Sequence, residues 1–130
     1  MKTTQSGFEG YNICEFTTLP PTSDRVFATR LGAEWSFDST ATDYCSADAA
    51  ILTAAHEVFA NTYSPSVQRT LFEIGELALA RVPHISRIEL KMPNVHFLSL
   101  DLTKLSRPNQ NAVLLPTDEP HGEIEAVITR

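Results

Sequence analysis

Three short stretches of this 130-residue sequence carry side chains that could bind a small polar ligand. The first is Ser64-Pro65-Ser66-Val67-Gln68, where an apolar pattern of helical period begins. Free backbone N–H groups and the helix dipole favour an anionic or carbonyl-rich ligand at such a point. The alternative is a capped helix start that binds nothing, and these residues alone leave both interpretations open.

The second stretch is Asp24-Arg25, which follows the turn-like residues Pro20-Pro21-Thr22-Ser23. The planar guanidinium of arginine suits bidentate recognition of an anion, so Arg25 is a candidate binding residue. A surface arginine that pairs with Asp24 would fit the same residues.

The third stretch, Met92-Pro93-Asn94-Val95-His96, is interpreted as a tight turn. An asparagine held there could present its amide to a ligand. It could equally satisfy the backbone of the turn, as asparagine often does.

The apolar periodicity of the chain predicts the elements that position these stretches. Residues 26–37 alternate with period two, which is typical of a strand with one buried face. The polar run 38–43 is a connection, and a helix follows with Ser46 as its N-cap. The apolar face of this helix consists of Ile51, Leu52, Ala55, Val58 and Phe59.

A second helix is predicted to begin at the first stretch and to end before Pro83. Ser64 suits its N-cap, and Pro65 suits the first helical position, where the missing N–H costs nothing. Its apolar positions are Val67, Leu71, Ile74, Leu77, Ala78 and Val82.

The rest of the chain is predicted to form strands. Residues 85–92 and 96–102 are strand-like on either side of the turn, 107–111 form a loop, and 122–129 alternate again, with Ile124, Ala126 and Ile128 on one side. This order predicts one α+β domain over residues 1–130, an antiparallel sheet with two helices packed on one face. Neighbouring subunits could cover the other face.

Composition and charge argue against several classes of partner. The formal net charge is −6 and the ten Lys and Arg residues are scattered, so no nucleic-acid partner is expected. No apolar run approaches the roughly 20 residues that span a bilayer, so no membrane partner is expected either. The start Met1-Lys2-Thr3-Thr4-Gln5 lacks the apolar core of a signal peptide, which predicts a cytoplasmic protein.

The cysteines and histidines do not form a local metal-binding pattern. Cys14 and Cys45 lack the CxxC spacing and are expected to be unpaired thiols. The histidines lie far apart in the sequence, so no metal site is predicted. They are His56, His84, His96 and His121.

The three stretches, taken together with the amino-terminal segment, resemble one family. Lys2-Thr3-Thr4-Gln5-Ser6-Gly7-Phe8-Glu9-Gly10-Tyr11, continued by Phe16-Thr17-Thr18-Leu19 and Asp24-Arg25, is similar to the spaced signature of urate oxidases. The stretches that begin at Ser64 and Met92, and Pro116-Thr117-Asp118-Glu119-Pro120-His121-Gly122, resemble that family in order and spacing. The resemblance covers essentially the whole chain.

The resemblance implies the tunnelling fold (T-fold) of the carboxy-terminal half of a urate oxidase, with its first strand truncated at Met1. In this family two such domains make one subunit, several subunits close their sheets into a barrel, and active sites lie at subunit interfaces. The implied reaction is cofactor-free oxidation of urate by dioxygen to 5-hydroxyisourate and hydrogen peroxide. The amino-terminal half, or homologous subunits, would be the partner.

Site residues are carried over position by position. Phe8 would stack on the flat purine and Leu19 would line the pocket. Arg25 and Gln68 would clamp the purine edge, since each charge-assisted hydrogen bond contributes about 1.5–3 kcal/mol. Two neighbours at the helix end would also contact the substrate, and these are Ser66 and Val67.

The remaining site residues come from the third stretch. Asn94 would lie above the ring where dioxygen or water binds, and His96 would support a proton relay that also needs a lysine and a threonine from the amino-terminal half. Val95 stands where the family usually has a lysine. Because the relay is incomplete without the amino-terminal half, the isolated chain is expected to turn over no urate.

Two alternatives remain open. The chain could be a non-catalytic T-fold fragment or assembly subunit that forms oligomers without turnover. It could also be a pterin-type T-fold enzyme, although some of those use a zinc site built from histidines, and no matching cluster is seen in this sequence.

Overall fold

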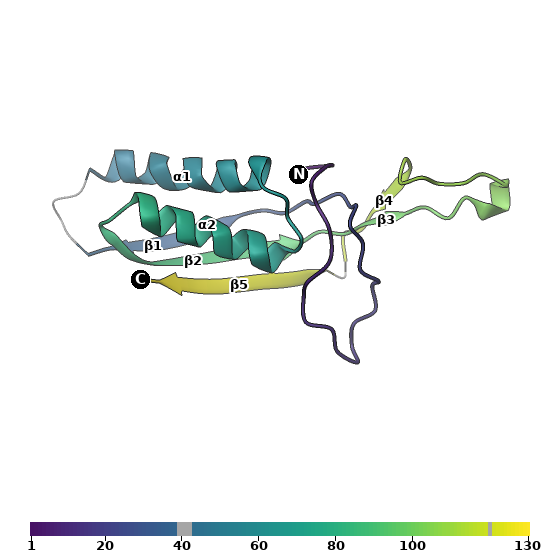
Figure 1. Ribbon diagram of the computed structural model, residues 1–130, viewed down its shortest axis with the longest axis horizontal. Helices are drawn as coiled ribbons and strands as arrows, with labels where there is room; N and C mark the ends of the chain where they lie inside the picture. The colour runs from purple at the N-terminus through teal and green to yellow at the C-terminus, as the bar shows by residue number, and fades with distance from the viewer. Residues whose placement is uncertain (39–42, 120) are drawn as a thin grey trace.

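The computed structural model describes residues 1–38, 43–119 and 121–130, and it has two helices on one face of a three-stranded antiparallel sheet (Figure 1). The strand order is β1-β2-β5. A second, two-stranded sheet forms an arm that projects from one end of this layer (Figure 1). The elements are β1 (Gly32–Phe37), α1 (Tyr44–Asn61), α2 (Val67–Arg81), β2 (Ile85–Asn94), β3 (Phe97–Ser99), the short 3-10 helix η1 (Thr103–Leu105), β4 (Leu114–Pro116) and β5 (Gly122–Thr129).

The core lies between the helices and the sheet, as the period-two patterns predict. Trp35, Ile88 and Ile128 are register partners across the three strands, and Ile88 and Ile128 are buried. In β5 the inward positions are those of the predicted alternation. Burying one face of each strand fixes the register, because a shift by one residue would expose all these side chains.

The first strand is shorter than the predicted 26–37. Phe27 is fully buried but makes only an isolated bridge with Lys2, and Ala28 makes one with Val95. The regular ladder starts at Gly32, and Leu31 is partly exposed rather than on the buried face. The predicted connection 38–43 falls mostly on residues 39–42, outside the described part of the chain.

The cap of α1 corrects the prediction of Ser46. Asp43 is the N-cap, and its carboxylate accepts hydrogen bonds from the Ser46 backbone N–H at 3.2 Å and from the Ser46 hydroxyl at 2.7 Å. The side chain of Leu52 is 53% exposed, so it does not belong to the buried face. At the other end Lys2 Nζ donates to the Thr62 carbonyl at 2.7 Å, which ties the chain's first residues to the end of α1.

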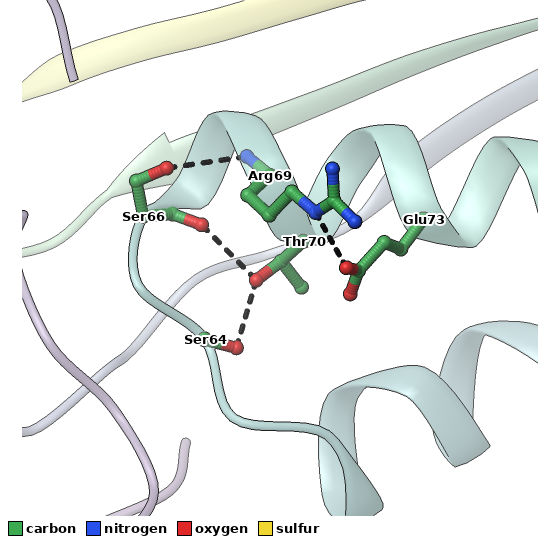
Figure 2. Close-up of polar contacts among 5 residues, drawn as sticks. All are labelled: Ser64, Ser66, Arg69, Thr70 and Glu73. Atoms are coloured by element: carbon green, nitrogen blue, oxygen red, sulfur yellow. Dashed lines mark hydrogen bonds and ion pairs between the residues drawn. The ribbon is translucent and has the colours of Figure 1, made fainter. Parts of the chain in front are cut away.

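The start of α2 also differs from the prediction by two residues. Ser66, not Ser64, is the N-cap, and its hydroxyl accepts from the Arg69 backbone N–H at 3.2 Å (Figure 2). Pro65 therefore lies outside the helix. The helix ends at Arg81, before Pro83, as predicted.

The turn predicted at residues 93–95 is wrong. β2 continues through Pro93 and Asn94, which pair with Glu123 and Gly122 of β5. Proline is tolerated there because β1 pairs with β2 only as far as Lys91, and contact on that side resumes at Val95.

The predicted strand 96–102 is also shorter, since β3 spans three residues and pairs with β4 rather than with the main sheet. β4 was not predicted. Across residues 1–38, 43–119 and 121–130, neither helix has the length and apolar character required to cross a bilayer.

Candidate active site

The Arg25 guanidinium is held by two protein oxygens. Its Nε donates to the Gly7 carbonyl, and its Nη1 donates to Asn94 Oδ1 at 2.7 Å. Nη2 is buried and has no hydrogen-bond partner within the described residues. Two nitrogens therefore fix the orientation of the guanidinium, and the third is a buried donor that no group among the described residues satisfies.

The same guanidinium packs between two aromatic rings. Its Cζ lies 4.6 Å from the ring centroid of Phe27 and 5.5 Å from that of Phe8, distances typical of cation–π contacts. Burial lowers the pKa of Arg25 to about 10, so the group is still a cation at neutral pH. No carboxylate forms an ion pair with Arg25 in the described part of the chain, which leaves its charge available to an anion.

A cavity of about 580 Å³ lies beside Arg25. Its wall includes four of the predicted site residues, which are Phe8, Leu19, Arg25 and His96. The rings of Phe8 and His96 meet edge to face, with centroids 6.1 Å apart. One aromatic face, one cation and one imidazole thus border the same space.

The β3–β4 arm forms the opposite wall of this cavity, with residues 110–112 facing it. Asn109 shapes this loop through four hydrogen bonds, to the carbonyls of Leu100 and Val113 and from the amides of Ala112 and Val113. Asn111 Nδ2 donates to Asp24 Oδ2 at 3.2 Å, so the arm closes onto the segment that carries Arg25.

His96 is half-buried at the cavity wall. Burial lowers its pKa below the ordinary 6.5, and the positive charges of Arg25 and His121 lower it further. The imidazole is therefore neutral at pH 7, with one nitrogen able to accept a proton. The backbone carbonyl of His96 accepts from both the N–H and the hydroxyl of Thr117.

The predicted residues at the start of α2 are not in the cavity wall. Ser66 and Val67 are buried and Gln68 is exposed. This helix end is connected to Arg25 through the backbone: the amides of Gly7 and Glu9 donate to the carbonyls of Ser64 and Pro65. The structure therefore brings Phe8, Leu19, Arg25 and His96 around one cavity and hydrogen-bonds Asn94 to Arg25. The cavity wall does not include Ser66, Val67 or Gln68.

Comparisons with known proteins show which family the chain belongs to. The family model named Uricase matches residues 1–125. The chain belongs to the uricase family. The uricase of Dictyostelium discoideum is 41% identical over 130 residues, and that of Oryctolagus cuniculus is 41% identical over 136. In each case the match covers 100% of this chain and 45% of the relative, so the chain spans about half the length of these uricases.

The fold agrees with that of solved uricases. The crystal structure of the uricase from Arthrobacter globiformis superposes with a TM-score of 0.92 at 34% identity, over 99% of this chain and 45% of that one. This match confirms the predicted α+β tunnelling fold.

Some residues around the candidate site were not predicted. The Gly7 carbonyl accepts a hydrogen bond from Arg25 Nε, and the guanidinium packs on the ring of Phe27. Gly7 lies within the signature segment and Phe27 lies just after it, but a backbone carbonyl and a buried ring carry no chemical signal in a sequence. Asn109 and Asn111 lie in the predicted loop 107–111. Their side chains, which hydrogen-bond readily, were the signal from which an ordered loop could have been predicted.

Proposed function

We propose that this chain supplies the anion-binding part of a urate oxidase, which oxidises urate with dioxygen and water to 5-hydroxyisourate and hydrogen peroxide. The proposal is carried by the environment of the Arg25 guanidinium. Two of its nitrogens donate to protein oxygens, the third is buried without a partner, and no carboxylate among the described residues pairs with it. A planar anion that accepts from Nη2 would satisfy this buried donor. The family membership and the 41% identity to two uricases support the choice of urate.

The cavity offers the other contacts that a flat heterocycle needs. In this proposal the half-buried ring of Phe8 stacks on the purine and Leu19 closes the pocket edge. Gln68 offers one donor and one acceptor to the opposite edge of the ring, with Ser66 and the Val67 backbone N–H beside it. Because Gln68 is exposed, its side chain is free to turn towards a bound ligand.

Asn94 and His96 are assigned to the oxidation step. Asn94 Oδ1 is engaged by Arg25, so its NH₂ group remains as a donor to dioxygen or water above the purine. His96, whose neutral form is favoured, accepts a proton and passes it on. The relay is completed by groups from the remaining half of the enzyme. This chain alone should therefore bind urate without oxidising it.

The same proposal includes an oligomer with interfacial sites, a cofactor-free reaction and the cytoplasmic location expected from the sequence. The Uricase match over residues 1–125, together with the fraction of each relative that the chain covers, supports the part of the proposal that concerns further subunits.

Two measurements test the proposal. Equilibrium dialysis without oxygen should show urate binding to the chain, and no binding would reject the proposed substrate. Oxygen uptake and hydrogen peroxide should then be measured with urate, for the chain alone and mixed with the remaining half of the Dictyostelium uricase. Turnover only in the mixture is expected. Steady turnover by the chain alone would contradict the assigned relay, and binding without turnover in either case would favour a non-catalytic assembly subunit.

A further inference from the structure

Three hydroxyl side chains are buried together at the start of α2. Ser64, Thr70 and Ser66 have exposed fractions of 1%, 1% and 4%. Thr70 Oγ1 donates to Ser64 Oγ at 2.7 Å and lies 3.1 Å from the Ser66 carbonyl (Figure 2). Buried hydroxyls are costly unless they are paired, so this geometry is a defined network rather than a solvated surface.

The contact of Thr70 with Ser64 reaches beyond the helix. The 3.1 Å contact with the Ser66 carbonyl stays local to the helix, because the Thr70 backbone N–H donates to the same oxygen at 3.2 Å. Ser64, by contrast, precedes the N-cap. The Thr70 side chain therefore links the body of α2 to the segment from which the helix starts.

Ser64 is in turn joined to the segment that anchors Arg25. Its N–H donates to the Gln5 carbonyl at 2.9 Å, and its carbonyl accepts from the Gly7 N–H at 2.8 Å. The Gly7 carbonyl then accepts from Arg25 Nε. An unbroken series of bonds thus runs from Thr70 through Ser64 and Gly7 to Arg25.

We propose that Thr70 is a positioning residue that holds the start of α2, with Val67 and Gln68, at a fixed place relative to Arg25. The inference rests on the proposed function, because it concerns two sides of the same urate-binding site. Thr70 is fully buried and acts through Ser64 and Ser66 rather than on the ligand. A rigid purine held at both edges binds more tightly when the backbone spacing between the two sides is set before the ligand arrives.

The test compares Thr70→Val, which keeps the volume but removes the hydroxyl, with Thr70→Ser, which keeps the hydroxyl. Thr53→Val is the matched control, since Thr53 Oγ1 makes the corresponding bond to the Ala49 carbonyl on the exposed side of α1 at 2.7 Å. Amide hydrogen exchange at Gly7 and Ser64 is followed by NMR, and urate affinity by dialysis without oxygen.

Thr70→Val should speed exchange at both amides and weaken urate binding, each by about five- to tenfold, the equivalent of one hydrogen bond. Exchange in β2 should stay unchanged. Thr70→Ser should restore both quantities, and Thr53→Val should match the wild type in both.

Several results would overturn the inference. One is wild-type exchange at Gly7 and Ser64 in Thr70→Val, and another is failure of Thr70→Ser to restore it. Unchanged urate affinity in a folded Thr70→Val with a lowered melting temperature would reduce Thr70 to a structural residue.

If Thr70→Val does not fold, Ser64→Ala removes the same bond and must speed the Gly7 exchange. Absence of urate binding in the wild type would reject the proposed function, whereas the exchange data would still decide the link between Thr70 and Gly7.

Discussion

Arg25 Nη1 donates a 2.7 Å hydrogen bond to Asn94 Oδ1, joining residues 69 positions apart. Asn94 is the last residue of β2 and is 6% exposed, so it is held by the sheet. Arg25 precedes β1, in a segment that has few regular backbone pairs of its own. The bond therefore transfers the rigidity of the sheet to the guanidinium, which preorganises the cation for an anionic ligand.

Replacing Arg25 with Met should abolish most urate binding. Methionine keeps apolar packing on the Phe27 ring but removes all charge-assisted donors. The loss of one or two such bonds, about 1.5–3 kcal/mol each, predicts a dissociation constant at least about tenfold higher. Dialysis without oxygen measures it. Arg69→Met is the control, because Arg69 lies on α2 and pairs with Glu73. Equal affinities for Arg25→Met and the wild type would show that the clamp is misassigned.

The charge at Asn94 supplies a separate prediction. Asn94→Asp keeps an oxygen that accepts from Arg25 but adds a buried negative charge beside the cavity. The new carboxylate should pair with Arg25 and compete with urate, raising the dissociation constant at least about tenfold. The fold should survive, because the aspartate is paired. Wild-type affinity in a folded Asn94→Asp would indicate that urate does not depend on the Arg25 charge.

The layers of the fold were predictable because each element buries one face. Both helices and the strand over residues 122–129 repeat their apolar residues at the period of the structure they form. Local chemistry was less decisive. Ser64 and Ser66 are equally good caps by residue type. In the structure Ser66 caps the helix, and the Ser64 hydroxyl is instead hydrogen-bonded to the buried Thr70 hydroxyl.

Residue chemistry alone singled out Arg25, Asn94 and the start of α2 as separate candidates, and only the family resemblance placed them in one site. No periodicity relates Arg25 to Asn94, since their contact requires the sheet to be assembled first. Pro93 suggested a turn, although the missing β1 partner past Lys91 makes a proline acceptable in this strand. β4 has only three residues, and two of them are exposed. A strand this short does not produce a periodic signal in the sequence.

The pKa of His96 predicts how stability depends on pH. Burial, then Arg25 and His121, hold the pKa of His96 below its ordinary 6.5. As the pH falls through 6.5 the unfolded chain binds this proton before the folded chain does, so the free energy of unfolding falls. His96→Gln should therefore lose less stability than the wild type between pH 7 and pH 5. Urea unfolding at both pH values measures this. His56→Gln, on the exposed side of α1, serves as the control, and identical slopes for His96→Gln and the wild type would refute the assignment.

At Gly75 the backbone of α2 lies close against Ile128 of β5. A Cβ built there would lie 2.7 Å from Ile128 Cδ1 and 2.9 Å from Cγ1. In an exposed helix, glycine to alanine gains about 1 kcal/mol. Here the added methyl should cost more than that, because overpacking a core typically costs about 1–3 kcal/mol. Gly75→Ala should therefore lower the urea midpoint of unfolding.

A second substitution separates crowding from helix propensity. Ile128→Val removes the Cδ1 atom nearest to the new methyl, and alone it should cost about 0.5–1.5 kcal/mol as a small cavity. In the double variant the alanine methyl fills part of that space. The unfolding free energy of the double variant should therefore be higher than the value expected if the two single effects simply added. A positive coupling in this cycle locates the strain between α2 and β5. Strict additivity, or a Gly75→Ala variant more stable than the wild type, would mean that α2 moves away from the sheet without cost.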